Sequence, residues 1–211
     1  MAHNPWWAPW ALSNLIEPAM RSLSTQIPEI AGMKSGDKTL DVCCGTGGLA
    51  FIYARIGIIA TGIDIDHRVI EVAREKATKL NLPNISFQTA SALELPFEDG
   101  SFDHASITMG IHEVSRDHRN AIISEMKRVV KSQGILVFLD YMAPLPQGPY
   151  SWLAKVTEFL AGSDHNSCFK DYLKQGGLMA LLNQHQLLGE RKRELSLVEI
   201  VLAKNEALAL T

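Results

Sequence analysis

The segment LDVCCGTGGLA, residues 40–50, leads from an apolar run through a glycine-rich turn into a helical pattern. A strand that enters such a turn presents backbone N–H groups at the start of the next helix, and glycines let a ligand approach the backbone closely. Asp64 ends the next apolar run, where a carboxylate can accept hydrogen bonds from both hydroxyls of a ribose. Ala50 occupies the third glycine position of the dinucleotide fingerprint, a replacement that such folds allow. These features predict a nucleoside-binding turn and leave the identity of the nucleoside open.

Short apolar runs alternate with longer segments of helical period along the chain, which predicts βαβ units around a parallel sheet. The expected strands cover residues 38–43, 58–64, 85–89, 102–109, 135–139, 185–190 and 195–203. A helix is expected to follow the glycine turn and to run to about Arg55, and further helices are expected over residues 11–26, 66–80, 116–131, 150–161 and 168–183. Gly134 is expected to end the helix over 116–131. The fold class is therefore α/β, a Rossmann-like sheet of seven mostly parallel strands with helices on both faces, in which the last strand is antiparallel and forms an edge hairpin with the strand before it.

The composition, with 46% hydrophobic and 20% charged residues over 211 positions, is that of one globular domain. A formal net charge of −3 lacks the basic excess of a nucleic-acid binder, so no nucleic-acid partner is expected. The densest basic cluster, residues 191–193, is interpreted as a solvated turn. The 3 cysteines form no C-x-x-C pair, so no metal site is expected. Without an apolar run of about 18 residues or a signal-peptide pattern, we expect a cytoplasmic chain with no stable membrane insertion.

The quoted segment and three later ones resemble, in order, the motifs of class I S-adenosylmethionine-dependent methyltransferases of the ubiquinone/menaquinone-biosynthesis type. The later segments are GIDIDHRVIEVAREKA, ELPFEDGSFDHASI and IHEVSRDHRNAIISEMKRVVKSQGILVFLDY, and the similarity continues in FKDYLKQGGLMALLNQHQLL. Four motifs in one order are far more specific than any one alone. The resemblance implies methyl transfer to a small, lipophilic or aromatic metabolite. It also implies a single domain over 1–211, with a helical lid over 1–30, a cofactor-binding core over 38–140 and acceptor-side helices over 141–185.

The resemblance further implies which residues hold S-adenosylmethionine. The turn would lie beside the methionine moiety, the acidic residue after the second strand would hold the ribose, and the end of the fourth strand would flank the reacting sulfonium. The expected cofactor-binding residues are Asp41, Gly45, Thr46, Gly47, Asp64, Ile65, Ser91, Ala92, Thr108 and Met109. Three places depart from the family pattern. Cys43 replaces its first glycine, Ser91 replaces an aspartate that usually bonds the adenine, and residues 132–134 replace a Pro-Gly-Gly turn.

Methyl transfer from a sulfonium needs positioning and exclusion of water more than an obligatory catalytic side chain. Where the acceptor must lose a proton, the catalytic candidates are His112, Asp140 and Tyr141, because they follow the fourth and fifth strands. A structural histidine that braces the loop is an equal interpretation of His112. Glu113 is interpreted as a support for the same loop, and His165 is a further candidate base.

Several alternatives stay open at this stage. Trp6, Trp7 and Trp10 are interpreted as part of a lid, although an aromatic plug, a dimer contact or a membrane-surface contact would use the same residues. A homodimer is therefore left open. The competing functions are a non-catalytic module that binds S-adenosylmethionine and a nucleotide-linked oxidoreductase. For the latter, the sequence offers no convincing Tyr/Lys or Cys/His pair.

Overall fold

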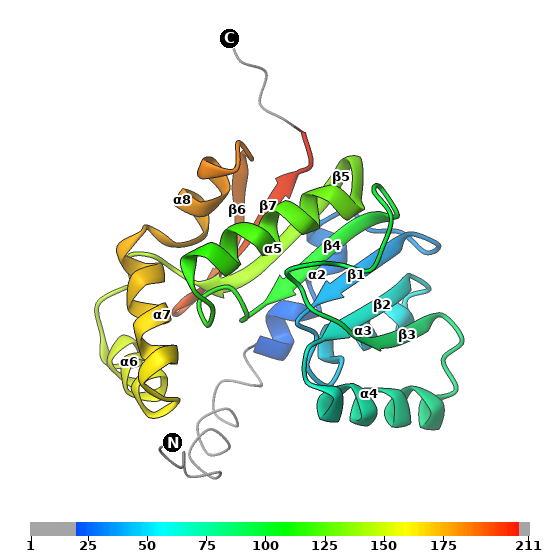
Figure 1. The fold of residues 1–211 in the computed structure, drawn as a ribbon, viewed down its shortest axis with the longest axis horizontal. Coiled ribbons are helices and arrows are strands. Elements are labelled where there is room, and N and C mark those ends of the chain that lie inside the picture. Colours follow the sequence, from blue (N-terminus) through cyan, green and yellow to red (C-terminus); the bar gives the residue numbers. More distant parts are fainter. Residues whose placement is uncertain (1–19, 207–211) are drawn as a thin grey trace.

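A seven-stranded sheet in the order β3-β2-β1-β4-β5-β7-β6 organises residues 20–206, the part of the chain that the computed structural model describes (Figure 1). The strands are β1 (Lys38–Val42), β2 (Ile59–Asp64), β3 (Ile85–Thr89), β4 (Phe102–Thr108), β5 (Val130–Tyr141), β6 (Gly189–Leu195) and β7 (Val198–Lys204). Strands β1 to β5 pair in parallel, whereas β7 runs antiparallel to both β5 and β6. The predicted fold class is therefore confirmed, including the edge hairpin and the antiparallel last strand.

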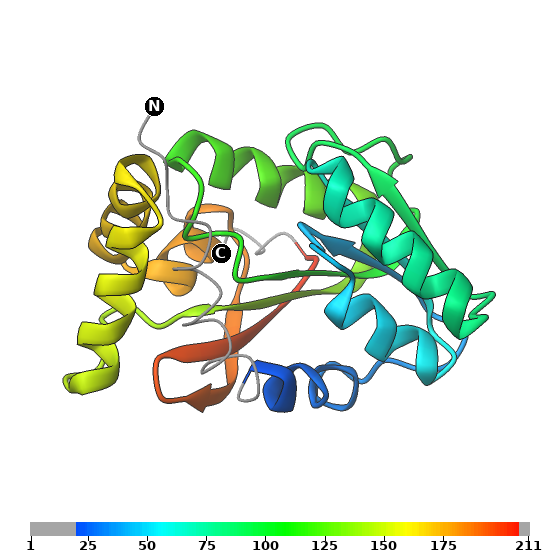
Figure 2. The ribbon, with the colours of Figure 1, turned by 90° about the horizontal axis from the view of Figure 1, so that it is seen from below.

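Helices cover both faces of this sheet, and two of them lie beyond one end of it. They are α2 (Ile27–Ile30), α3 (Gly48–Arg55), α4 (His67–Leu80), α5 (Arg116–Val129), α6 (Pro149–Leu160), α7 (Ser163–Lys174) and α8 (Gly177–Gln184). Helix α5 lies on the face opposite to α2 and α3 (Figure 2). Helices α6 and α7 pack together beyond the ends of β4 and β5 (Figure 1). The central strands are thus buried from both sides, and β5 is fully buried from Leu136 to Tyr141.

The strand order reverses between β1 and β4, which makes this the switch point of the sheet. The chain leaves β1 toward β2 on one side and returns through β4 on the other. In open α/β sheets a crevice forms at such a point, outside the carboxyl ends of the strands, and ligands bind there. The loops after β1, β2, β4 and β5 are therefore the parts of the chain from which a site must be built.

The prediction that Gly134 ends a helix was wrong. Helix α5 ends at Val129, and β5 begins at Val130, which pairs with Phe102 of β4. The next pair joins His104 to Ile135, so residues 131–134 bulge out opposite a single residue of β4. The apolar spacing of α5 continues into the strand, and only the pairing with β4 decides where the helix stops. Gly134 instead lets the bulge of β5 approach β4 closely, because a Cβ at position 134 would lie 2.4 Å from the carbonyl oxygen of Asp103.

Two other predicted boundaries shift in the carboxyl-terminal third. The single helix expected over 168–183 is two helices, because Gly176 and Gly177 adopt positive φ angles of 92° and 66° between α7 and α8. The strand expected over 185–190 lies further along, as β6. The basic cluster at 191–193 is consequently part of this edge strand and not a turn. Charged residues on an edge strand discourage pairing with another sheet, which is a reason for finding them there.

The predicted amino-terminal helix falls mostly outside the described residues. Residues 20–24 are helical, and Trp6, Trp7 and Trp10 lie outside the description. Over residues 20–206, none of the helices combines the length and the apolar character that crossing a bilayer requires.

Gly134→Ala tests the explanation of the bulge. The added methyl group would overlap a backbone oxygen and a side-chain carbon of Val130 at 2.5 Å, so we expect a loss of about 2 kcal/mol in the free energy of unfolding. Gly48→Ala is the matched control, because a Cβ on Gly48 meets nothing within 4 Å and alanine favours a helix. Urea unfolding of the three proteins measures the difference. Equal stability of both variants would contradict the proposed role of Gly134.

Candidate active site

The turn after β1 is held open by its own backbone and by Asp64. Gly45 and Gly47 have positive φ angles of 53° and 81°, and Gly47 is the N-cap of α3. One oxygen of Asp64 accepts a 2.9 Å hydrogen bond from the Gly45 N–H, and the other accepts a 3.0 Å bond from the Asp66 N–H. A Cβ on Gly45 would meet nothing within 4 Å. The turn and its carboxylate therefore border open space into which a ligand can fit.

Cys43 adopts a glycine-like conformation at the first position of the turn. Its φ angle is 54°, in the left-handed region that costs an L-residue about 1–2 kcal/mol. The sequence places this cysteine where the family has glycine, and the backbone keeps the shape that glycine would take. Burial raises the pKa of the Cys43 thiol to about 12, and burial also raises the pKa of Cys44. Burial therefore favours the protonated thiol in both cysteines of the turn.

Asp41 lies in β1 beneath the turn and is almost completely buried. One of its carboxylate oxygens accepts a 2.9 Å hydrogen bond from the hydroxyl of Ser106, its register partner on β4. Burial raises the pKa of Asp41 to about 7, although the hydrogen bond from Ser106 opposes the shift. A buried carboxylate directly under the open turn is a place where a cationic ligand group would gain more than it would at the surface.

The residues expected around the adenine follow β2 and β3. Ile65 is 77% exposed, an unusual state for an isoleucine beside a buried strand end, and an apolar ring would cover it. The hydroxyl of Ser91 accepts a 3.2 Å hydrogen bond from the Leu93 N–H, so it shapes its own loop. Ala92 is partly buried against the core, whereas Thr46 is exposed on the turn.

A cavity of about 850 Å³ joins the turn to the acceptor side, which is within the usual range for small-molecule sites. Its walls include Cys44 and Gly48 near the turn, Thr108 and Met109 at the end of β4, Met20 and Arg21 of the amino-terminal helical residues, and Tyr141, Glu158 and His165 opposite them. Of the expected cofactor residues, only Thr108 and Met109 are among these walls. Asp64, Ile65, Ser91 and Ala92 lie along the neighbouring strand ends instead.

Asp140 organises the acceptor side from the end of β5. Its carboxylate is buried and accepts hydrogen bonds from the Ile111 and His112 N–H groups at 3.1 and 3.3 Å and from its neighbour, the Tyr141 N–H, at 2.7 Å. It also lies 2.6 Å from Nδ1 of His112. Burial opposes a charge on His112, but Asp140 outweighs burial and raises the pKa of His112 to about 9. The carboxylate thus fixes both the loop after β4 and the orientation of the imidazole.

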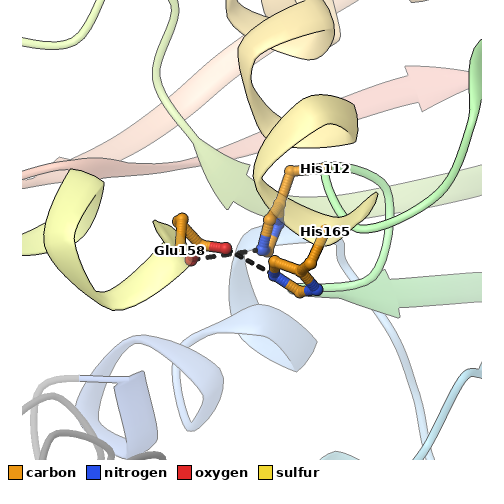
Figure 3. A group of neighbouring side chains, drawn as sticks. All are labelled: His112, Glu158 and His165. Carbon is orange, nitrogen blue, oxygen red and sulfur yellow. Dashed lines mark ion pairs between the residues drawn. The ribbon is translucent and has the colours of Figure 1, made fainter. Parts of the chain in front are cut away.

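Two further side chains meet His112 from the helices beyond the sheet. Glu158 of α6 lies 3.7 Å from Nε2 of His112, and His165 of α7 forms an ion pair with the same glutamate (Figure 3). The hydroxyl of Tyr141 donates a 3.1 Å hydrogen bond to Glu158. The three predicted catalytic residues therefore do come together. Glu158 was missed by the sequence analysis, and its only signal is that it is the sole acidic residue of a mainly apolar helix.

Buried Arg119 connects the loop after β4 to helix α7. Its guanidinium donates to the Ile111 carbonyl at 3.1 Å and pairs with Asp171 of α7 at 2.8 Å. Tyr172 of α7 donates a 2.7 Å hydrogen bond to the carbonyl of Tyr141. Helix α7 is thus fixed against the strand ends, so the acceptor side is a formed wall.

Comparison with known proteins agrees with this geometry. A family model described as a methyltransferase domain matches residues 39–134. Demethylmenaquinone methyltransferase from Staphylococcus aureus is 39% identical over 116 residues, which are 54% of this chain and 46% of that protein. The chain thus spans about half the length of the curated relatives that it matches.

Solved structures with the same fold include other methyltransferases. An S-adenosylmethionine-dependent methyltransferase from Aquifex aeolicus has a TM-score of 0.68 and 20% identity, covering 94% of this chain and 98% of its own. Phosphoethanolamine N-methyltransferase 2 from Haemonchus contortus, in complex with S-adenosylmethionine, has a TM-score of 0.67 and 15% identity, covering 88% of this chain and 52% of its own. At these identities the likeness concerns the fold.

Residues 39–134 therefore match a methyltransferase domain, and solved structures with the same fold include methyltransferases whose cofactor is S-adenosylmethionine. The donor set suits this cofactor. A buried carboxylate under an open turn matches a cationic amino group, and a carboxylate fixed at the end of β2 matches two ribose hydroxyls.

Asp41→Asn tests the burial of the carboxylate. The pKa of Asp41 is about 7 in the folded protein and near 3.9 in an unfolded chain, so the folded state holds a proton that the unfolded state loses. Stability from this group therefore falls as pH rises through that window. Asparagine is neutral at every pH. The free energy of unfolding of the variant relative to the parent should therefore increase by about 2–3 kcal/mol from pH 5 to pH 8. Urea unfolding at both pH values measures this, and a pH-independent difference would contradict it.

Proposed function

We propose that this protein transfers a methyl group from S-adenosylmethionine to a small-molecule acceptor held between the sheet edge and α6–α7. The observation that carries the proposal is the continuous cavity, which reaches from the glycine turn past the end of β4 to Tyr141, Glu158 and His165. Cofactor and acceptor must meet in one space for a direct transfer, and this cavity joins the glycine turn and the end of β4 to the acceptor side.

S-adenosylmethionine, when bound, supplies an electrophilic methyl group on a sulfonium. The chain's own contribution is to bind and orient. Asp64 would hold the ribose, and Asp41 would attract the amino group. Thr108 and Met109 would flank the sulfonium, and the Met109 N–H donates a 2.8 Å hydrogen bond to the carbonyl oxygen of Leu139, which supports this strand end. Holding the two reactants in fixed positions lowers the entropic cost of bringing them together for the reaction.

The side chains at the acceptor end of the cavity favour binding of a partly apolar molecule that carries a polar group. The cavity offers the methionines Met20 and Met109 as apolar contacts and places Tyr141, Glu158 and His165 together at one end. A phenol or quinol ring would bury its apolar face and direct its oxygen toward that end. The similarity to an enzyme named demethylmenaquinone methyltransferase supports the same class, a small lipophilic or aromatic metabolite. Helices α6 and α7 then serve as the acceptor-binding part of a single domain.

Calorimetric titration tests the proposal. S-adenosylmethionine should bind the full chain with micromolar affinity and NAD should not bind. Asp64→Ala should lose at least ten-fold in affinity, since it removes charge-assisted hydrogen bonds to the ribose. Asp117→Ala, at an exposed position in the first turn of α5, is the matched control and should bind as the parent does.

Activity is read as formation of S-adenosylhomocysteine with a panel of quinols, phenols and amines. Turnover with one acceptor class supports the proposal. Preference for NAD would support an oxidoreductase instead. Binding of S-adenosylmethionine without turnover on any acceptor would support a non-catalytic module.

A further inference from the structure

His112, Glu158 and His165 converge on one point from three different segments of the chain. They come from the loop after β4, from α6 and from α7, and each offers one ligand atom within 4.8 Å of the other two (Figure 3). Two imidazole nitrogens and a carboxylate oxygen are the donors that divalent transition metals prefer. From this convergence we propose that the three side chains bind a divalent transition-metal ion, for which Zn²⁺ is the test ion, at the acceptor end of the cavity.

The spacing suits a metal with little rearrangement. Zinc lies about 2.0–2.2 Å from nitrogen and oxygen ligands, so two ligand atoms of one ion are roughly 3–3.5 Å apart. Nε2 of His112 and Oε1 of Glu158 are 3.7 Å apart, and His165 is already in contact with the other oxygen of Glu158. All three ligand atoms lie within 4.8 Å of one another, close to the spacing of a bound ion.

Supporting residues hold two of the three ligands in the required orientation. Asp140 lies 2.6 Å from Nδ1 of His112, so that nitrogen donates its proton to the carboxylate and Nε2 faces the cluster. Metal-binding histidines characteristically use their second nitrogen in this way. The hydroxyl of Tyr141 donates to Oε1 of Glu158 and orients the carboxylate. These contacts distinguish the cluster from histidines and acids that merely lie near each other.

The charge around the cluster favours a cation. Asp140 and Glu158 are both buried, and the half-exposed Glu113 lies 4.0 Å from Nε2 of His112. Oε2 of Glu158 is buried and receives no hydrogen bond of good geometry. Over residues 20–206, only His112 and His165 pair with Glu158 as basic groups. A buried carboxylate is costly without full compensation, and a dication between the two histidines would supply it.

Three protein ligands leave coordination positions open, and the cavity adjoins this point because Glu158 and His165 line it. An oxygen of the acceptor would take an open position, which favours a phenol, enol or hydroquinone over an amine. The proton that such an oxygen loses on coordination passes to solvent. This part of the inference rests on the proposed function, whereas metal binding does not. The sequence predicted no metal site, since the ligand positions 112, 158 and 165 form no short-spaced motif.

Metal content and affinity are measured on tag-free, full-length protein that has been stripped with a chelator. After dialysis against Zn²⁺, the parent should retain one ion per chain by elemental analysis, and calorimetry with Zn²⁺ alone should give micromolar or tighter binding. Co²⁺ in its place should give the visible absorption of a site with nitrogen and oxygen ligands. Absence of stoichiometric metal and of the Co²⁺ spectrum in the parent overturns the inference without recourse to any variant.

Variants then locate the ion. Glu158→Gln and His165→Ala should each lose at least ten-fold in Zn²⁺ affinity and should change the Co²⁺ spectrum. His185→Ala is the matched control, because that partly buried histidine contacts Asn120 at 3.0 Å and belongs to α5–α8 packing; it should bind as the parent does. Unchanged affinity in both site variants overturns the assignment. Titration with S-adenosylmethionine of the same samples separates the two proposals, since either ligand can bind when the other fails.

Discussion

Parallel pairing of β2, β1, β4 and β5 is the constraint on which the rest of this structure depends. It forces four segments of the chain to leave the sheet at one edge, so that groups distant in sequence arrive side by side. Asp64 meets the Gly45 N–H and Asp140 meets His112 for this reason alone. The same pairing buries the strands on both faces, which removes water from the carboxylates that lie at or near their ends. The parallel direction of the strands therefore determines the position of the site more than any single residue does.

Two buried carboxylates stabilise different parts of this edge of the sheet. Asp41 lies beneath the cofactor turn and takes its hydrogen bond from the neighbouring strand. Asp140 holds the loop after β4 through backbone N–H groups and orients His112. Burying a carboxylate lowers the free energy of unfolding unless its hydrogen bonds are complete, so such positions are retained where charge is useful.

The glycine turn and the position of Asp64 could be predicted from the sequence because their signals are local. The glycine turn directly follows β1, and Asp64 is the last residue of β2, so both are read from the ends of apolar runs. The end of α5 could not be predicted, because Val129 and Val130 continue the apolar spacing and only pairing with Phe102 separates helix from strand. The role of Glu158 could not be predicted either, because its partners come close only when α6 folds back over the edge of the sheet.

The hairpin of α6 and α7 contributes Glu158 and His165 but none of the residues of the glycine turn. It follows β5 without interruption by any strand and rejoins the sheet only through α8 and the edge hairpin. On the proposed function, part of the acceptor recognition is therefore encoded in a stretch of the gene separate from the glycine turn. Recombination or drift within this one stretch could change which compounds are accepted while leaving the methyl donor untouched, so relatives that share the first half of the chain need not share a substrate.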